Sequence, residues 1–314
     1  GLAVRVGCDN HDELASLAKR GGFLIQALSN DAAAVAKARK QMAERKLTDK
    51  VWISLFDGRR LPFADNVVNL LVADTDTTLS RAEMMRVLTP RGVLIVGTKK
   101  TVKPVPPNID EWTHHLHDAS GNAVAKDTVV GPPERLKWAA KPLWSKHHNA
   151  TANVNAMVSA KGRVFMICDE SPVSIDPTLM PDQWNLVARD AFNGILLWRI
   201  PINLWGTKAW NPRSPRGRNN QPTHIGRRLV AVGDRVYVTL GYNAAVSELD
   251  AATGKVLRVL DGTQRADAIL WKDGKLILSI NKGPQHASKS PRREPSEPPV
   301  RKEVVVLDLR SGKI

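Results

Sequence analysis

The chain has 314 residues, of which 42% are apolar. That share is typical of globular rather than disordered proteins, and the length allows two domains. No apolar run reaches the roughly 18 residues that a membrane-spanning helix needs, so no transmembrane segment is predicted. The net charge of +15 can indicate a nucleic-acid-binding protein. However, both residues 1–103 and residues 104–314 carry part of the excess, so no specific nucleic-acid site is predicted.

The first hundred residues alternate between strand-like and helix-like segments. The apolar runs predict five strands, and the segments between them predict three helices. Near-continuous apolar strands separated by helices predict a parallel sheet covered on both faces, which is a three-layer, Rossmann-like α/β domain over residues 1–100. Ligands of such sheets bind at the carboxyl ends of the strands. The predicted strands are 3–6, 23–28, 51–55, 67–73 and 93–96, and the predicted helices are 12–19, 31–46 and 81–88.

Two segments of this domain resemble class I S-adenosylmethionine-dependent methyltransferases. The run from Asp57 to Asn66 is similar to the segment that follows strand 3 in that family, and the run from Glu83 to Leu94 is similar to its turn into strand 5. The resemblance covers about residues 1–97. It implies that S-adenosylmethionine is a candidate cofactor, with its binding residues at Gly7, Asp9, Ser29, Asp57 and Gly58.

The cofactor motifs depart from the family pattern at two places. The family has a Gly-x-Gly-x-Gly turn after strand 1, whereas here Gly7 is followed by Cys8, Asp9, Asn10 and His11. The family also has a carboxylate at the end of strand 2 that accepts both ribose hydroxyls, and Ser29 offers only one hydroxyl oxygen there. We therefore expect a shortened methyltransferase-type domain that is structural rather than catalytic, with a working methyltransferase as the alternative.

Residues 101–137 are predicted to link this domain to the rest of the chain. After strand 5 the family continues into an antiparallel hairpin, whereas here Lys103 to Pro107 indicate a linker. The segment 110–148 holds five of the eight histidines, including His147 and His148. His115, His117 and Asp118 could share one side of an extended segment, but they match no established metal-ligand spacing. The sequence therefore predicts packing histidines and no metal site.

A short phrase of the form Asp-x-x-x-Gly occurs three times in the second part of the chain. The copies are Asp190–Gly194, Asp250–Gly254 and Asp308–Gly312, and their closing glycines lie 60 and 58 residues apart. Each copy follows two strand-like runs. The aspartate can accept hydrogen bonds from nearby backbone amides, and the glycine can adopt a positive φ. A period of this length with paired strands predicts repeated β-blades.

The repeats and the segment that leads into them resemble quinoprotein-type β-propellers. The phrase ending at Trp198 is similar to the repeat of PQQ-like proteins, and residues 110–138 resemble the segment before the propeller in large bacterial members. Some of these members carry a methyltransferase-like domain in front. The resemblance implies an all-β, partial propeller of about three blades over residues 138–314. Because closed propellers have about four to eight blades, we expect further blades to complete it.

The repeat alone does not assign a cofactor. Quinone-dependent dehydrogenases bind PQQ next to a calcium ion held by acidic and amide side chains, and Glu170 and Asp190 are candidates here only because they are carboxylates. The adjacent cysteine pair of many such enzymes is missing, because Cys8 and Cys168 are the two cysteines. PQQ with calcium is therefore less favoured than S-adenosylmethionine, and no catalytic residue is predicted.

Two insertions, residues 201–228 and 283–302, are predicted to be surface loops. The favoured function is a binding or scaffolding protein of the bacterial periplasm or cell envelope, a location that rests on the resemblance alone. Its propeller is expected to bind a protein partner, with an anionic polymer or lipid as another candidate. The first alternative is an S-adenosylmethionine-dependent methyltransferase, and the second is a PQQ-dependent oxidoreductase.

Overall fold

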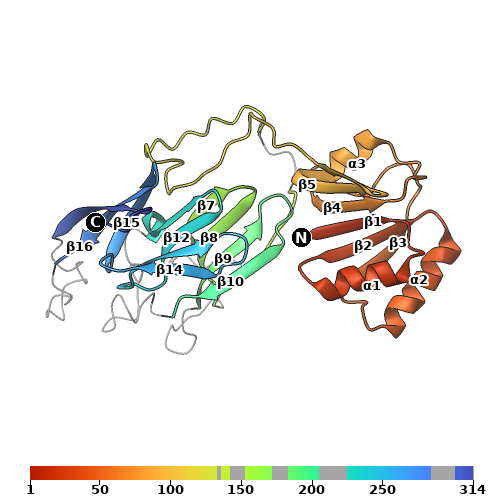
Figure 1. Ribbon diagram of the computed structural model, residues 1–314, viewed down its shortest axis with the longest axis horizontal. Helices are drawn as coiled ribbons and strands as arrows, with labels where there is room; N and C mark the ends of the chain where they lie inside the picture. Colours follow the sequence, from red (N-terminus) through yellow and green to blue (C-terminus); the bar gives the residue numbers. More distant parts are fainter. Residues whose placement is uncertain are drawn as a thin grey trace. The chain divides into compact units, whose positions relative to one another are not determined.

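The computed structural model describes residues 1–132, 136–141, 153–171, 183–203, 205, 225–283 and 301–313, and Figure 1 shows its helices and strands. The chain divides into two compact units. The first, called here the α/β unit, contains Gly1–Ile109, Thr128–Trp138 and Phe192–Ile195. The second, called the β unit, contains Asp110–Asp127, Ala139–Ala191 and Leu196–Ile314.

The α/β unit contains one six-stranded sheet and three helices. Its strands lie in the order β3-β2-β1-β4-β5-β6, and β1 to β5 are parallel. This arrangement confirms the Rossmann-like fold class predicted for the first domain. The elements are β1 (Leu2–Val6), α1 (His11–Arg20), β2 (Leu24–Ser29), α2 (Ala32–Glu44), β3 (Val51–Leu55), β4 (Val68–Ala73), α3 (Arg81–Val87), β5 (Leu88–Val96) and β6 (Lys99–Val102).

Each helix of this unit begins at a side chain that accepts hydrogen bonds from its first free amides. Asn10 caps α1, and acidic residues in the first turn suit the positive end of the helix dipole. Asp31 caps α2 through the amides of Ala33 and Ala34, at 2.7 and 3.2 Å. These caps place the amino ends of α1 and α2 next to the carboxyl ends of β1 and β2.

The two faces of the sheet have separate apolar cores. On one face α1 and α2 cover β1, β2 and β3, with Leu14, Ile25 and Met42 buried in one cluster. On the other face α3 covers β4 and β5, with Leu71 and Val87 buried in a second cluster. Figure 1 shows the helices on the two sides of the sheet. The three layers hold the strand ends rigidly, which is what a ligand site at that edge requires.

The end of this sheet differs from the sequence prediction. We expected the chain to leave strand 5 directly for a linker, but it turns at Gly97 and adds β6 antiparallel to β5. Two lysines and no apolar run make β6 hard to recognise in the sequence. The same composition suits an edge strand, where lysines prevent pairing with another chain. The α/β unit therefore has the antiparallel strand that the sequence analysis found missing.

The described residues of the β unit form three consecutive antiparallel sheets. The first has the order β10-β9-β8-β7, the second β11-β12-β13-β14 and the third β15-β16-β17. All six strand-like runs that precede the Asp-x-x-x-Gly copies are strands, which confirms the all-β character of this part. The strands are β7 (Val154–Ala160), β8 (Arg163–Asp169), β9 (Trp184–Asp190), β10 (Leu196–Pro201), β11 (Leu229–Val232), β12 (Arg235–Thr239), β13 (Val246–Asp250), β14 (Val256–Leu260), β15 (Ala266–Lys272), β16 (Lys275–Asn281) and β17 (Lys302–Asp308).

The Asp-x-x-x-Gly copies are tight turns of the predicted kind. In the second copy one carboxylate oxygen of Asp250 accepts the amides of Ala252 and Thr253, at 3.1 and 2.9 Å, and Gly254 has a φ of 73°. In the third copy Asp308 accepts two amides in the same way, and Gly312 has a φ of 70°. The turn chemistry inferred from the sequence is therefore confirmed.

Neighbouring sheets of the β unit pack through their apolar faces. One buried cluster joins the first and second sheets, and another joins the second and third. Trp198, at the end of the first sheet, is 9% exposed and donates from Nε1 to the Ala251 carbonyl in the turn of the second sheet, at 3.1 Å. Arg258, 60 residues later, donates to the Leu309 carbonyl in the turn of the third sheet, at 3.0 Å. The repeat thus encodes the contact between sheets as well as the turn.

Candidate ligand site of the α/β unit

The predicted cofactor residues all lie in the loops at the carboxyl ends of β1, β2 and β3. Because these strands are neighbours in the order β3-β2-β1, their loops meet at one edge of the sheet. In open α/β sheets this edge, beside the point where the strand order reverses, is where ligands bind. Strand β1 is at that point, since it has β2 on one side and β4 on the other. We call this edge the crevice, and it includes the loops after β1, β2, β3 and β4.

Gly7 makes the first turn of the crevice. Its φ of 95° is in the region that favours glycine, and its amide donates to the Leu28 carbonyl at 2.7 Å, which ties the ends of β1 and β2 together. Cys8 is buried behind the turn, and Asp9 is exposed. Gly7 is the one glycine left of the glycine-rich turn found in the methyltransferases, and its positive φ is a conformation that glycine readily adopts.

Ser29 ends β2 and is almost completely buried. Its hydroxyl oxygen accepts the amide of Asp31 at 3.2 Å, and it also forms a hydrogen bond with the Cys8 thiol. The carboxylate of Asp31 caps α2, as described above. The loop after β2 therefore holds one hydroxyl at the position expected to meet a ribose, and its nearby carboxylate already serves the helix.

Asp57 and Gly58 follow β3. One oxygen of the Asp57 carboxylate accepts the amides of Arg59 and Arg60, at 2.8 and 3.0 Å, and these hydrogen bonds lower the pKa of the carboxyl. Asp57 is exposed and hence ionised at neutral pH. Gly58 has a φ of 76°, and a Cβ there would be 3.3 Å from the side-chain nitrogen of Asn30. The side chain of Asn30, in the loop after β2, therefore lies beside Gly58.

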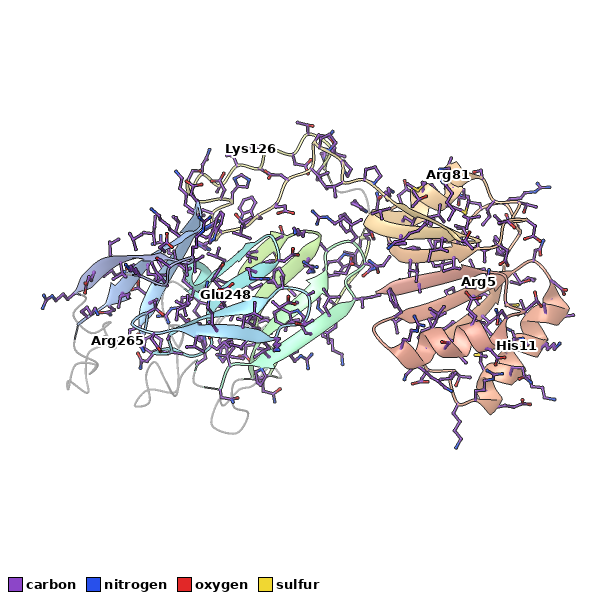
Figure 2. All side chains as sticks on the ribbon, in the orientation of Figure 1. Arg5, His11, Arg81, Lys126, Glu248 and Arg265 are labelled. Atoms are coloured by element: carbon purple, nitrogen blue, oxygen red, sulfur yellow. The ribbon has the colours of Figure 1, made fainter. Side chains whose placement is uncertain are left out.

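Two charged residues that the sequence analysis did not single out complete the crevice. Arg5, in β1, places its guanidinium over the loop after β4, where Nη2 donates to both carboxylate oxygens of Asp74 at 2.9 Å. Its Nε donates to Glu13 in the first turn of α1 at 3.1 Å, and its Nη1 donates to the Val6 carbonyl. Figure 2 labels Arg5 and His11, which both lie at this end of the sheet.

This ion cluster is adjacent to Gly7. A Cβ at Gly7 would be 3.3 Å from Nη1 of Arg5 and 3.5 Å from a carboxylate oxygen of Asp74. The side chain of Arg5 is 8% exposed, whereas that of Asp74 is 61% exposed. Burial lowers the pKa of Arg5, and its hydrogen bonds with Asp74 and Glu13 more than offset this, so the net pKa is raised. Arg5 is therefore a permanent positive charge with carboxylates around it.

Carboxylates dominate the central loops of the crevice. In the loops after β1, β2 and β4 and at the start of α1 they belong to Asp9, Asp31, Asp74 and Glu13, and Arg5 lies among them, whereas the loop after β3 also carries the exposed Arg59 and Arg60. This is notable in a chain whose net charge is +15. The electrostatic potential at a site depends on the nearest charges more than on the net charge of the chain.

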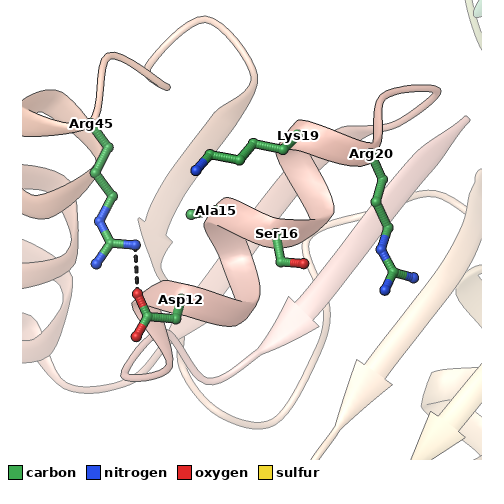
Figure 3. Close-up of a pocket in the computed structure, with 6 residues that line it drawn as sticks. All are labelled: Asp12, Ala15, Ser16, Lys19, Arg20 and Arg45. Atoms are coloured by element: carbon green, nitrogen blue, oxygen red, sulfur yellow. Dashed lines mark hydrogen bonds and ion pairs between the residues drawn. The ribbon is translucent and has the colours of Figure 1, made fainter.

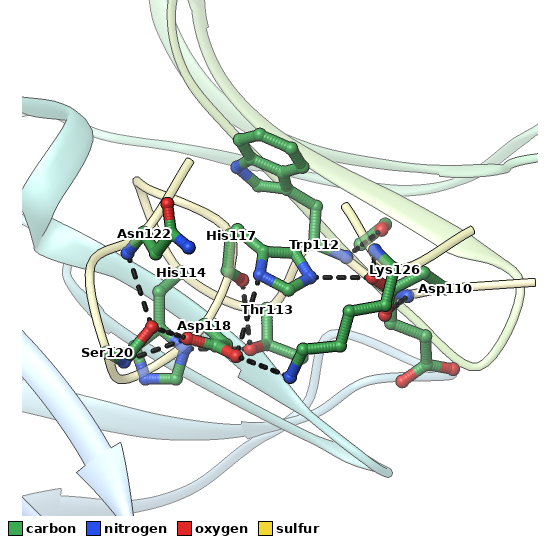
Figure 4. Close-up of polar contacts among 11 residues, drawn as sticks. Asp110, Trp112, Thr113, His114, His117, Asp118, Ser120, Asn122 and Lys126 are labelled. Atoms are coloured by element: carbon green, nitrogen blue, oxygen red, sulfur yellow. Dashed lines mark hydrogen bonds and ion pairs between the residues drawn. The ribbon is translucent and has the colours of Figure 1, made fainter. Parts of the chain in front are cut away.

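The histidine-rich segment of the β unit forms a compact network of hydrogen bonds, shown in Figure 4. His117 Nε2 and Asp110 Oδ2 are 2.7 Å apart, and His114 Nδ1 lies 2.7 Å from the Thr113 hydroxyl. Within the described part of the chain no group of three or more His, Cys, Asp or Glu side chains could hold a metal ion. His147 and His148 lie outside the described residues, as do residues 206–224 and 284–300 of the two predicted loops.

The same segment, residues 110–118, crosses the first strands of all three sheets, and we call it the strap. The Trp112 amide donates to the Ser159 hydroxyl of β7 at 2.9 Å. The Thr113 carbonyl accepts the Ala231 amide of β11 at 3.0 Å, and the Trp271 amide of β15 donates to His114 Nε2 at 3.0 Å. His114 therefore connects the strap to the third sheet, and the backbone of Trp112 and Thr113 connects it to the first two.

A hollow lies on α1 and is shown in Figure 3. It has a volume of about 410 Å³ and is lined by Asp12, Ala15, Ser16, Lys19, Arg20 and Arg45. Arg45 pairs with Asp12 at 2.7 Å. The hollow is open and contains none of the predicted cofactor residues.

No helix among the described residues is long and apolar enough to cross a membrane.

Comparison with known proteins gives local structural likenesses. No protein-family model matches the chain, and no curated protein matches it. A solved structure described as an S-adenosyl-L-methionine-dependent methyltransferase of Methanococcus maripaludis is 25% identical and has a TM-score of 0.29. It covers 31% of this chain and 47% of its own. The [4+2]-cyclase SpnF is 28% identical over 30% of this chain and 37% of its own, with a TM-score of 0.28.

A geranyl diphosphate C-methyltransferase from Streptomyces coelicolor A3(2), solved with S-adenosyl-L-homocysteine, is 18% identical. It covers 30% of this chain and 38% of its own, with a TM-score of 0.28. The matched part thus spans less than half of each of these proteins. These partial likenesses do not assign a chemistry to the crevice, so any chemistry proposed for it must be argued from its own residues.

Proposed function

We propose that the α/β unit binds S-adenosylmethionine in the crevice and that the chain is an S-adenosylmethionine-dependent methyltransferase. The observation that carries the proposal is the cluster of carboxylates around a left-handed Gly7 at the switch point of a sheet of this order. The ligand has a positive sulfonium and a positive ammonium against one carboxylate. An acidic crevice in an otherwise basic chain suits that charge.

The residues of the crevice fit this ligand unevenly. Gly7 lets backbone approach the ligand without a Cβ, and Asp74 and Glu13 offer negative charge for its cationic end. The exposed carboxylate of Asp57 suits the nucleoside end. Ser29 offers a single hydroxyl to the ribose, so this end is held less well. When bound, S-adenosylmethionine supplies a methyl group on a positively charged sulfur.

The weaker fit at Ser29 sets the expected affinity. A hydrogen bond to a charged group contributes about 1.5–3 kcal/mol, and each 1.4 kcal/mol is about a tenfold change in affinity. A crevice with Ser29 in place of a carboxylate should therefore bind about tenfold or more weakly than one with the carboxylate. We expect a dissociation constant that is measurable by calorimetry but not tight.

Isothermal titration calorimetry of the purified chain with S-adenosylmethionine tests the proposal. We expect saturable binding to one site and severalfold weaker binding by Asp57→Asn. The control is Asp49→Asn, which makes the same charge change at an exposed position before β3, at the opposite edge of the sheet. The absence of heat at millimolar ligand, or equal losses in the two variants, would overturn the proposal.

A second candidate function, a binding or scaffolding role of the β unit, is supported by the strap. Hydrogen bonds from one segment to β7, β11 and β15 suit sheets arranged as propeller blades, with these three strands nearest the axis. On this proposal the β unit presents a protein-binding surface in the bacterial envelope. The PQQ alternative gains no support from the described residues.

The blade arrangement predicts a specific geometry. An experimental structure of the β unit should have its sheets arranged around one axis, with residues 110–118 across the inner strands. Sheets that instead stack in an open row would contradict a propeller. This outcome is independent of whether the crevice binds S-adenosylmethionine.

A further inference from the structure

The hollow on the outer surface of α1 is surrounded mainly by basic side chains. Asp12, Ser16 and Lys19 follow one another at helical spacing, so they share one face of α1. Arg20 is the last residue of this helix, and Arg45 comes from the end of α2. Two neighbouring helices thus bring cationic groups to one place on the surface of the α/β unit.

Arg45 is the fixed part of this arrangement. Its Nη1 donates to the carboxylate of Asp12 at 2.7 Å and to the His11 carbonyl at 3.4 Å, and its side chain is 35% exposed. The N–H groups on its Nε and Nη2 have no partner within the described part of the chain. The planar guanidinium is therefore held in position while most of its donors stay open to a ligand.

Lys19 and Arg20 are both exposed, and neither has an ion pair or a side-chain hydrogen bond among the described residues. Figure 3 shows the side chains of Lys19 and Arg45 extending toward the same part of the hollow, on either side of the small Ala15. Cationic groups that line one hollow add to the local positive potential. An anion that contacts both of them is therefore stabilised more than it would be by either one alone.

We propose that this hollow binds the phosphate group of a phosphate monoester. Its charged side chains are Lys19, Arg20 and Arg45 against Asp12, and three positive groups less one negative group leave +2. A phosphate monoester carries about −1.5 to −2 at neutral pH and has three strong acceptor oxygens, so it balances this charge, whereas a single carboxylate does not. The hydroxyl of Ser16 is a further donor at the same place.

The site is separate from the crevice, because none of the predicted cofactor residues lines it. The inference therefore holds whether or not the crevice binds S-adenosylmethionine. The volume of about 410 Å³ lies within the usual range for small-molecule sites, so part of the molecule that carries the phosphate also has room. A soluble phosphate monoester and the head group of phosphatidic acid present the same group, and the experiment includes both.

An NMR titration of the isotope-labelled chain with inorganic phosphate, at constant low ionic strength, tests the site. We expect saturable shifts of the amide signals of residues 16–21 and none in the loops of the crevice. Lys19→Gln should weaken binding about threefold to fivefold, as for one exposed charge pair. The matched control is Lys37→Gln, which removes the same charge from an exposed position of α2 outside the hollow and should leave the affinity unchanged.

Asp12→Asn distinguishes a ligand site from a structural effect. Its side chain is 89% exposed, and loss of its negative charge should strengthen phosphate binding severalfold, whereas damage to the fold would weaken it. Acetate, which has a single charge, should bind more weakly than phosphate. No shift in α1 at saturating phosphate, equal affinities of Lys19→Gln and the wild type, or acetate binding as tight as phosphate binding would overturn the proposal.

The source of the phosphate group is tested with glycerol phosphate and with vesicles of equimolar phosphatidylcholine and phosphatidic acid. Binding of glycerol phosphate that weakens in Lys19→Gln supports the proposal and indicates a soluble ligand. Vesicle binding with the same dependence on Lys19, and none of glycerol phosphate, supports it and indicates a lipid head group. Binding of neither probe would overturn it.

Discussion

The contact between Trp198 and the turn at Gly254 gives a prediction with an internal control. Gly254 and Gly312 close equivalent turns, with φ values of 73° and 70°. A Cβ at Gly254 would be 2.7 Å from Cδ2 of Trp198, whereas a Cβ at Gly312 would have no described atom within 4 Å. Alanine at the two positions therefore shares the backbone strain and differs in the clash.

The magnitudes follow from these geometries. An L-residue in the left-handed region costs about 1–2 kcal/mol, which is the whole effect expected of Gly312→Ala. Gly254→Ala adds an overpacking cost of about 1–3 kcal/mol, because no real Cβ contact is as short as 2.7 Å. The shift of Trp198 also weakens its bond to the Ala251 carbonyl. We expect Gly254→Ala to be at least about 1 kcal/mol worse than Gly312→Ala.

Urea denaturation followed by tryptophan fluorescence measures the difference in the free energy of unfolding. Shortening the indole in Trp198→Leu should relieve the clash, so the double variant Gly254→Ala with Trp198→Leu should lose less than the two single variants added together. Equal destabilisation by Gly254→Ala and Gly312→Ala, or strict additivity in the double variant, would refute the contact between sheets as described.

Three further predictions concern the crevice, the strap and the end of α3. Ser29→Asp should bind S-adenosylmethionine about tenfold more tightly by calorimetry, since a carboxylate can accept both ribose hydroxyls. The control Ser16→Asp, on the outer face of α1, should leave the affinity unchanged. Equal affinities of Ser29→Asp and the wild type would contradict the site. Burial lowers the pKa of His114, so below about pH 6.5 unfolding takes up a proton at this residue. The free energy of unfolding of the β unit should therefore be constant above about pH 6.5 and fall below it. In urea titrations at several pH values, His114→Gln should flatten this profile. An unchanged profile in His114→Gln would exclude His114 as the source. Lys103 Nζ donates to the carbonyls of Met85 and Leu88, both at 2.7 Å, so Lys103→Met should destabilise the α/β unit by about 1–3 kcal/mol in thermal unfolding, and no loss would contradict this role.

Local patterns in the sequence predicted local structure well. The apolar runs of the first hundred residues predicted all five parallel strands. The Asp-x-x-x-Gly phrase predicted the tight turn that follows each pair of strands. In each case the interacting residues lie within one turn or one periodic stretch, so their spacing alone carries the information.

Contacts between distant residues were not predictable in this way. Nothing in an apolar strand shows that Arg5 meets Asp74, which lies 69 residues away, and the crevice owes its charge pattern to that pair. The amide of Trp271 donates to His114, 157 residues away, and no local pattern in the sequence indicates this contact. Strand β6 was missed because its pairing with β5, and not its composition, makes it a strand.

A crystal structure of the chain with S-adenosylhomocysteine tests the central claim most directly. The account predicts the ligand at the carboxyl ends of β1 to β4, next to Gly7 and with its nucleoside end beside Asp57. Absence of the ligand from this edge of the sheet at saturating concentration would contradict it.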